Sequence, residues 1–146
     1  MSWNLKEIYK ALNKRFKHTE NIEFQKVSID SRKISSKDFF IPIVGKNYDG
    51  HNFIDEVTNF GVKACLVERK KNYLVKNSSI HKIFVSNTQQ SLQELASYAR
   101  KRNKNLNMIC ITGSSGKTSL KDWIGKVLNE KVNTYVNPGN FNNEIG

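Results

Sequence analysis

The 146-residue sequence is poor in the residues that mark specialised classes of protein. Two cysteines, two prolines and eight glycines are too few for a disulfide scaffold or a low-complexity chain. No apolar run approaches the roughly 20 residues of a membrane span, and the N-terminus has no basic flank, apolar stretch or cleavage site of a signal peptide. Cys65 and Cys110 lie in apolar segments, where we expect buried free thiols in a reducing cytosol.

Acidic residues are scarce beside basic ones. The chain has 13 Asp plus Glu against 24 Lys plus Arg, a net charge of +11, which suits anionic partners. The charges are scattered, with denser runs at residues 69–71 and 100–104, and no aromatic-basic motif of a nucleic-acid module accompanies them. We therefore expect a solvated basic surface without nucleic acid, and keep a basic nucleic-acid-binding module as an alternative.

Apolar segments at two different spacings alternate along the chain and predict an α/β fold. We expect strands near residues 27–29, 39–44, 64–67, 83–85 and 108–111, and a further strand near 132–136. Helices are expected at 4–13, at 53–60 with Gly61 as its stop, at 88–102 and from 117 onward. Capping-box patterns, Asn4 with Glu7 and Asn87 with Gln90, precede two of these helices.

The predicted elements form two groups, with a boundary near residue 86. Residues 1–86 would form a small α/β domain, and residues 87–146 would begin a second one. We expect Trp3 and Trp123 to pack in apolar cores. In the last helix we expect four residues to face inward: Leu120, Ile124, Val127 and Leu128.

The strongest motif is the sequence T-G-S-S-G-K-T-S at residues 112–119, between a predicted strand and a predicted helix. Glycines allow close approach of backbone N–H donors to a phosphate, Lys117 would bind the β and γ oxygens, and Thr118 would offer a hydroxyl to Mg²⁺. An ordinary turn with an exposed lysine is the simpler alternative. The common loop pattern has a glycine five places before Gly116, where this chain has Ile111, so the motif indicates a variant loop.

This variant resembles the ATP loop of the Mur ligases, and three further segments agree. Asp30-Ser31-Arg32 resembles the D-S-R signature of the family's UDP-sugar domain. Residues 45–53 resemble its G-x-x-x-D-G-H-x-F segment, and residues 139–146 its G-N-x-N-N-x-I-G stretch. The resemblance spans nearly the whole chain.

The resemblance implies a UDP-sugar-binding domain at 1–86 and the incomplete start of a P-loop ATPase domain at 87–146. It implies that Ser31 and Arg32 hold the uridine diphosphate, although a strand-ending turn is the alternative. It implies that Lys117, Asn142 and Asn143 are catalytic and that Thr118 binds Mg²⁺. Glu144 could bind a metal or face solvent. We expect Asp49-Gly50-His51 to be a structural turn. The residues implied to bind ATP are Gly113, Ser114, Ser115, Gly116, Lys117, Thr118 and Ser119.

The activity implied is ATP-dependent amide-bond formation in peptidoglycan precursor synthesis in the cytoplasm. A UDP-N-acetylmuramoyl tripeptide would be activated as an acyl phosphate with ATP and Mg²⁺, and D-alanyl-D-alanine added, by a monomer without a membrane span. The double serine in the loop and residues 139–146 favour this branch over the sister ligase that adds the third peptide residue. A small P-loop kinase is a further alternative. We expect no ligation by these 146 residues alone, because at most one predicted strand follows the loop.

Overall fold

The computed structural model describes residues 2–76 and 79–138. By packing, the chain divides into two compact units, Met1–Arg102 and Asn103–Gly146. Among the helices of the described residues, none combines the length and apolar character needed to cross a bilayer.

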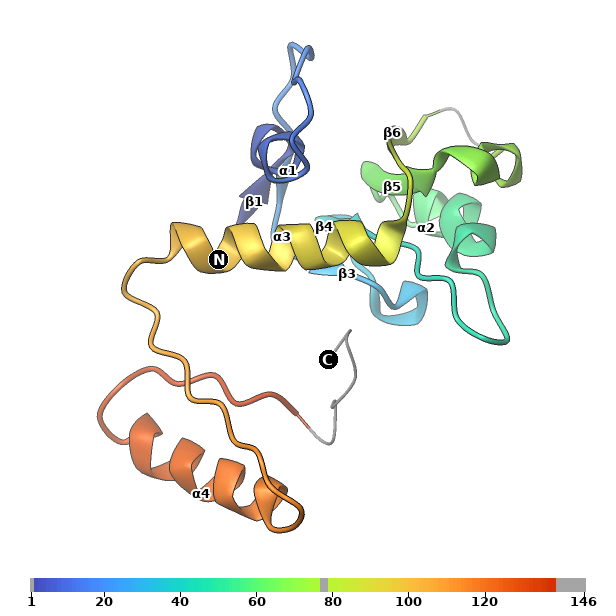
Figure 1. Ribbon diagram of the computed structural model, residues 1–146. Helices are drawn as coiled ribbons and strands as arrows, with labels where there is room; N and C mark the ends of the chain where they lie inside the picture. The colour runs from blue at the N-terminus through green and yellow to red at the C-terminus, as the bar shows by residue number, and fades with distance from the viewer. Residues whose placement is uncertain (1, 77–78, 139–146) are drawn as a thin grey trace. The chain divides into compact units, whose positions relative to one another are not determined.

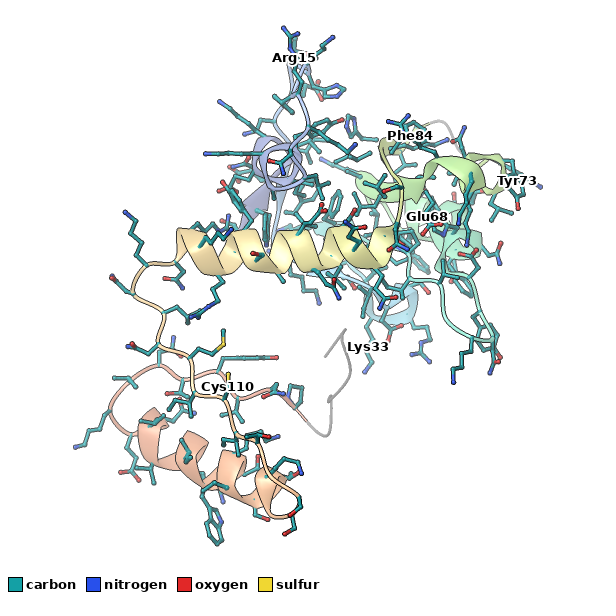
Figure 2. All side chains as sticks on the ribbon, viewed as in Figure 1. Arg15, Lys33, Glu68, Tyr73, Phe84 and Cys110 are labelled. Atoms are coloured by element: carbon teal, nitrogen blue, oxygen red, sulfur yellow. The ribbon has the colours of Figure 1, made fainter. Side chains whose placement is uncertain are left out.

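The first unit is built on a four-stranded parallel sheet (Figure 1). The strands run in the order β3-β4-β5-β6, and β5 ends at Glu68, which is labelled in Figure 2. A separate antiparallel pair joins β1 to β2. The strands are Trp3–Asn4 (β1), Glu23–Phe24 (β2), Lys26–Ser28 (β3), Asp38–Phe40 (β4), Ala64–Glu68 (β5) and His81–Val85 (β6). This parallel sheet with intervening helices confirms the predicted α/β class.

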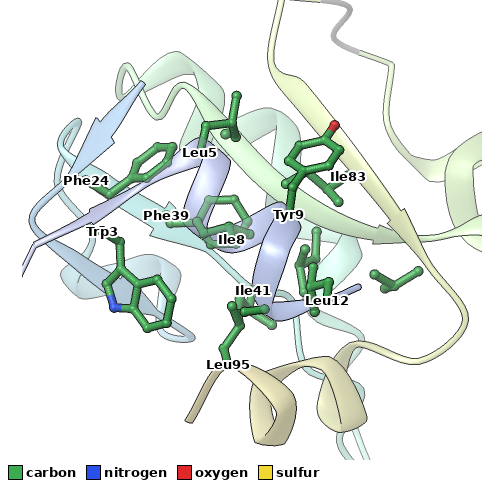
Figure 3. Packing of buried hydrophobic residues seen from close by; sticks show 14 residues of the cluster. Trp3, Leu5, Ile8, Tyr9, Leu12, Phe24, Phe39, Ile41, Ile83 and Leu95 are labelled. Atoms are coloured by element: carbon green, nitrogen blue, oxygen red, sulfur yellow. The ribbon is translucent and has the colours of Figure 1, made fainter. Parts of the chain in front are cut away.

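Helices cover both faces of this sheet, so its central strands are apolar on both sides. Helices α1 (Leu5–Ala11) and α3 (Thr88–Arg102) pack on one face with Phe39 and Leu66 of the strands (Figure 3). Helix α2 (Ile54–Asn59) packs on the other face, where Cys65 is buried. Burial on both sides explains why residues 64–67 of β5 form a continuous apolar run, and the predicted burial of Cys65 is confirmed.

Capping determines where α1 and α3 begin. The Asn4 side chain accepts from the Glu7 N–H at 2.9 Å, and the Glu7 carboxylate accepts from the Asn4 N–H at 3.1 Å. Asn87 accepts from the Gln90 N–H at 2.8 Å in front of α3. Each cap satisfies an N–H group that the first helical turn leaves without an intrahelical partner. The reciprocal capping box at α1 and the bounds 88–102 are confirmed.

The end of α3 is fastened to the first unit. The guanidinium of Arg102 donates to Glu7 at 2.9 Å and to the Ser2 carbonyl at 3.0 Å, and lies 4.2 Å from the centre of the Trp3 ring. These contacts place α3 within Met1–Arg102, whereas the predicted boundary near residue 86 separates α3 from the sheet. The assignment of residues 1–86 as a substrate domain stays a prediction.

Two details of the first unit differ from the predictions. The strand expected at 39–44 ends at Phe40 because Pro42 lacks the N–H group that a central strand needs. Phe60, the last residue of the helix predicted at 53–60, lies after the end of α2 and is exposed, while Gly61 stops the helix with φ of 89°. That positive φ suits glycine, as predicted.

The second unit is organised by helix α4 (Lys117–Asn129). Its buried Gly125 allows the segment containing Val136 to approach, since a Cβ at this glycine would lie 2.3 Å from Val136 Cγ2. The strands predicted at 108–111 and 132–136 are absent from described residues 103–138. A strand needs a hydrogen-bonded neighbour, and this stretch supplies none.

Several burial predictions for the second unit are therefore wrong. Leu120 and Val127 are exposed, and Trp123 has an exposed fraction of 67%. Cys110, which is labelled in Figure 2, is also exposed. Their apolar pattern predicts a buried face only if further elements cover it, and residues 103–138 provide no sheet to do so.

Candidate functional site

The carboxyl ends of the four parallel strands collect the segments singled out from the sequence. Residues 30–32 follow β3, residues 45–53 follow β4, residues 69–71 follow β5, and α3 begins after β6. Because neighbouring parallel strands point the same way, these segments lie at one edge of the sheet. Ligands of open α/β sheets bind outside this edge, which makes it the candidate site of the first unit.

Asp30 organises the first of these segments. Its carboxylate accepts from the Arg32 N–H at 3.1 Å and so caps the short helix η1 (Ser31–Lys33). The same carboxylate accepts from Arg32 Nε at 2.9 Å and from Nη2 at 3.0 Å. These side-chain hydrogen bonds lower the pKa of Asp30 and raise the pKa of Arg32. Arg32 is exposed and Ser31 half-buried at this edge, so both are accessible there, and binding of a diphosphate by them stays a prediction.

Asp49 organises the second segment in a similar way. It accepts from the His51 N–H at 3.0 Å, capping η2 (Gly50–Phe53), and its Oδ1 lies 2.7 Å from His51 Nδ1. Lys71, on η3 (Arg69–Leu74), donates to the other carboxylate oxygen. Burial opposes ionisation of Asp49, but the hydrogen bonds from Lys71 and His51 outweigh it and lower the pKa of Asp49 to about 2.

Position 50 requires glycine because the backbone of residues 42–43 passes too close to it for a side chain. A Cβ at this position would lie 2.7 Å from Ile43 N and 2.9 Å from Pro42 Cα. The Gly50 N–H instead donates to the Ile43 carbonyl at 3.0 Å, and Val44 forms a β-bridge with Asp49. The loop after β4 is therefore closed tightly at the point where Asp49 and His51 are held.

His51 is wholly buried, and both of its ring nitrogens are engaged. Its Nε2 accepts from the Glu68 N–H at 3.1 Å, so the ring proton sits on Nδ1, facing Asp49. This arrangement leaves neither nitrogen available as a catalytic base. The structural turn expected at residues 49–51 is confirmed.

Glu68 continues this buried network toward α3. Its side chain, at the end of β5, is buried and accepts from the Thr88 N–H at 3.3 Å (Glu68 is labelled in Figure 2). The carboxylate also lies 3.7 Å from Lys70 Nζ. A carboxylate at the first turn of a helix complements the helix dipole. The ends of β5 and β6 are thereby joined to the Asp49 turn by His51 and Glu68, a connection that the sequence does not predict.

The second unit carries the phosphate loop before α4. Gly113 has φ of 149° and Gly116 of 76°, and Gly116 occupies the N-cap of α4 without a side-chain cap. No side chain at the N-cap therefore competes with an anion for the first-turn N–H groups, which suits a phosphate. Lys117 Nζ donates to the carbonyls of Gly113 and of Ser114, the latter at 3.3 Å, which holds its charge over the loop.

These features fit a nucleotide phosphate. Glycine in two positive-φ positions, an uncapped helix start and a lysine over the loop are the parts such a site needs. Thr118, the residue expected to reach Mg²⁺, lies in the first turn of α4. Ser115 lies in the loop before α4, and Ser119 follows Thr118 within the helix. Asn142, Asn143 and Glu144, with the whole of residues 139–146, lie outside the described residues.

One further cluster was not anticipated from the sequence. The Tyr9 hydroxyl lies 2.9 Å from His18 Nε2 and 3.1 Å from His81 Nε2, beside an open depression of about 900 Å³. Burial, followed by the charge of His18, lowers the pKa of His81. The depression is at the amino ends of β5 and β6, away from the motif residues, and its members are too far apart in sequence to form a recognisable pattern. In the described part of the chain no group of three or more His, Cys, Asp or Glu is placed to hold a metal.

The fold and the geometry of these sites are typical of α/β proteins that bind phosphate-containing ligands. A parallel sheet with capped, basic turns at its carboxyl edge and a glycine-bounded loop before a helix support that class. The family model "Mur ligase family, catalytic domain" matches residues 23–100, which lie ahead of the phosphate loop. The chain belongs to the Mur ligase family.

Relatives of known function agree with this assignment. The chain is 38% identical over 126 residues to the UDP-N-acetylmuramoyl-tripeptide–D-alanyl-D-alanine ligase of Buchnera aphidicola subsp. Baizongia pistaciae, covering 86% of this chain and 26% of the relative. It is 38% identical over 120 residues to the ligase of the same name from Bacillus subtilis, covering 82% and 26%.

Solved structures share the fold. MurF from Acinetobacter baumannii matches with a TM-score of 0.83 and 30% identity over 99% of this chain and 31% of that one. MurF ligase from Thermotoga maritima, solved in complex with ADP, matches with a TM-score of 0.64 and 32% identity over 83% of this chain and 27% of that one. The chain thus spans about a quarter to a third of the length of the relatives it matches.

Proposed function

We propose that this chain is part of an ATP-dependent ligase that adds D-alanyl-D-alanine to a UDP-N-acetylmuramoyl tripeptide in peptidoglycan precursor synthesis. The observation that carries the proposal is the joint presence of the D-S-R and D-G-H turns at one sheet edge and the phosphate loop before α4. Relatives named for this activity, matched over most of the chain, support it. The proposed setting is the cytoplasm, where the nucleotide precursor and ATP are available, and the proposed state is a monomer.

In this proposal the first unit holds the uridine diphosphate end of the substrate. Arg32 presents a guanidinium, which binds diphosphate oxygens through paired hydrogen bonds, and Ser31 adds a hydroxyl. Lys70, which follows β5, adds positive charge at the same sheet edge. Gripping one end of a long substrate reduces the freedom of its distant carboxylate before reaction.

The second unit takes the ATP phosphates in this proposal. The amides of residues 113–119 and the charge of Lys117 stabilise the phosphate oxygens, and the Thr118 hydroxyl is the proposed ligand for Mg²⁺. Amide formation from a carboxylate is uphill in water, so the substrate carboxylate is first phosphorylated and the amine then displaces phosphate. Phosphoryl transfer depends mostly on positioning and charge neutralisation, which these residues supply. The proposed contributions of Asn142 and Asn143 are to orient the reacting groups.

The sister ligase that adds the third peptide residue is the second candidate, because it shares the D-G-H turn. A titration with UDP-N-acetylmuramoyl dipeptide, its acceptor, against the tripeptide distinguishes the two. Tighter binding of the tripeptide supports the D-alanyl-D-alanine branch. We also expect no ligation by residues 1–146 alone, since residues 103–138 contribute a loop and a helix but no strand.

Calorimetric titration with UDP-N-acetylmuramoyl tripeptide tests the substrate assignment. Arg32→Ala should weaken binding by roughly tenfold or more, because a charge-assisted hydrogen bond contributes about 1.5–3 kcal/mol. Lys33→Ala is the matched control, since Lys33 is an exposed cation on the same short helix and should change affinity far less. Equal affinities for the two variants would contradict the assignment. Salt-dependent binding of arbitrary DNA in place of the tripeptide would favour the nucleic-acid alternative.

A further inference from the structure

The D-S-R and D-G-H segments contain the same structural device. In each, an aspartate accepts from the backbone N–H of the second residue after it, Asp30 from Arg32 and Asp49 from His51. In each, the same carboxylate oxygen also contacts a side-chain nitrogen of that residue, Arg32 Nε at 2.9 Å and His51 Nδ1 at 2.7 Å. The aspartate therefore fixes both the backbone and the side chain of its partner.

The two copies differ in what they do with the side chain. His51 is wholly buried, and both of its ring nitrogens make contacts inside the protein, with the Asp49 carboxylate and with the Glu68 N–H. Arg32 has a side-chain exposed fraction of 84%, yet Asp30 holds it at two nitrogens. An exposed ion pair contributes little to the free energy of unfolding, so stability does not account for holding Arg32.

The geometry of the pair leaves one edge of the guanidinium open. Arginine has five N–H donors, and Asp30 takes one on Nε and one on Nη2. No hydrogen bond is made by Nη1 within the described residues. The remaining donors on Nη1 and Nη2 form the edge that pairs with two oxygens of a carboxylate or phosphate. Because Asp30 binds one edge of the Arg32 guanidinium, the other edge is left facing solvent.

We propose that Asp30 is a positioning residue that holds Arg32 ready for an anionic phosphate group of the substrate. The inference rests on the proposed function, in which that group belongs to a uridine diphosphate. Ordering a long side chain before binding removes part of the entropic cost of binding. The negative charge of Asp30 works in the opposite direction, because it offsets some of the attraction between Arg32 and an anion. In this proposal the gain from ordering is the larger effect.

Asp30→Asn separates this role from helix capping. Asparagine caps a helix about as well as aspartate, so the bond to the Arg32 N–H and the turn are kept. The amide NH₂ that replaces Oδ2 is a donor and cannot accept from Nη2, so the two-point hold on the guanidinium is lost. The melting temperature, followed by circular dichroism, should stay at the wild-type value.

The test is calorimetric titration of the full 146-residue chain with UDP at fixed ionic strength. Four proteins are compared: wild type, Asp30→Asn, Arg32→Ala and the double variant. We expect Asp30→Asn to weaken UDP binding by roughly two- to tenfold, the range for one side chain ordered in advance. Because Asp30 acts through Arg32, the double variant should bind UDP as Arg32→Ala does.

The outcomes separate this proposal from the proposed function. If Asp30→Asn binds UDP as tightly as wild type or more tightly, or weakens the Arg32→Ala protein further, positioning by Asp30 is overturned while the substrate site stands. If wild type binds no UDP, or Arg32→Ala binds it as wild type does, the proposed function is overturned and this inference with it.

Discussion

Replacing His51 with leucine should destabilise the first unit strongly. The Glu68 N–H donates to His51 Nε2 at 3.1 Å inside the protein, and leucine leaves it without an acceptor. A buried donor left unsatisfied costs about 1–3 kcal/mol, and losing the hydrogen bond to the Asp49 carboxylate adds about 1.5–3 kcal/mol. Leucine fills most of the vacated space and returns part of this, so we expect the free energy of unfolding to fall by about 2–4 kcal/mol.

Urea denaturation followed by tryptophan fluorescence measures this loss. Trp3 is buried in the first unit, whereas Trp123 belongs to the second, so a Trp123→Phe background leaves Trp3 as the only tryptophan of the chain. His18→Leu in the same background is the matched control, since His18 is exposed and should cost less than about 1 kcal/mol. If His51→Leu lowers the free energy of unfolding no more than the control does, the buried hydrogen bonds of His51 do not stabilise the first unit as we infer.

Three further perturbations follow from the same geometry. Gly50→Ala should lower the free energy of unfolding by about 1–3 kcal/mol, because the added Cβ would lie under 3 Å from backbone atoms. Gly45→Ala is the control and should be nearly neutral, because its Cβ would lie 3.5 Å from Tyr48 O; the urea midpoints of the two variants are compared with that of wild type. The pKa of Asp49 is lowered to about 2 in the folded protein, below its unfolded value near 4. Ionised Asp49 therefore stabilises the fold above pH 4, and this contribution is lost as the pH falls toward 2. Between pH 5 and 2.5 the urea midpoint should fall less for Asp49→Asn than for wild type. Lys117→Ala should abolish ATP binding in calorimetry without changing the melting temperature, whereas Lys126→Ala, near the other end of α4, should bind ATP normally.

Local signals allowed the elements of the first unit to be predicted from sequence. The bounds of α3 follow from the Asn87 cap and from the run of basic residues at its end, both properties of neighbouring residues. The apolar run at 64–67 predicts β5 because burial on both faces leaves no polar alternation. The D-S-R and D-G-H segments were recognised as motifs, but the grip of Asp30 on Arg32 is a matter of three-dimensional geometry.

Features that depend on distant residues escaped prediction. His51 contacts Glu68 across 17 residues of sequence, and Glu68 contacts Thr88 across 20, and nothing in the local sequence of any of the three indicates this. The apolar residues of 108–111 and Trp123 read as buried, yet burial requires a covering sheet that described residues 103–138 do not contain. Periodicity indicates which face of an element is apolar, and the rest of the fold decides whether that face is covered.

The most direct test of the two-site account is the ligand selectivity of two variants, measured by calorimetry with UDP-N-acetylmuramoyl tripeptide and with ATP plus Mg²⁺. Arg32 belongs to the first unit and Lys117 to the second. We predict that Arg32→Ala loses the tripeptide and keeps ATP, and that Lys117→Ala loses ATP and keeps the tripeptide. Loss of both ligands in both variants, or of neither in either, would contradict it.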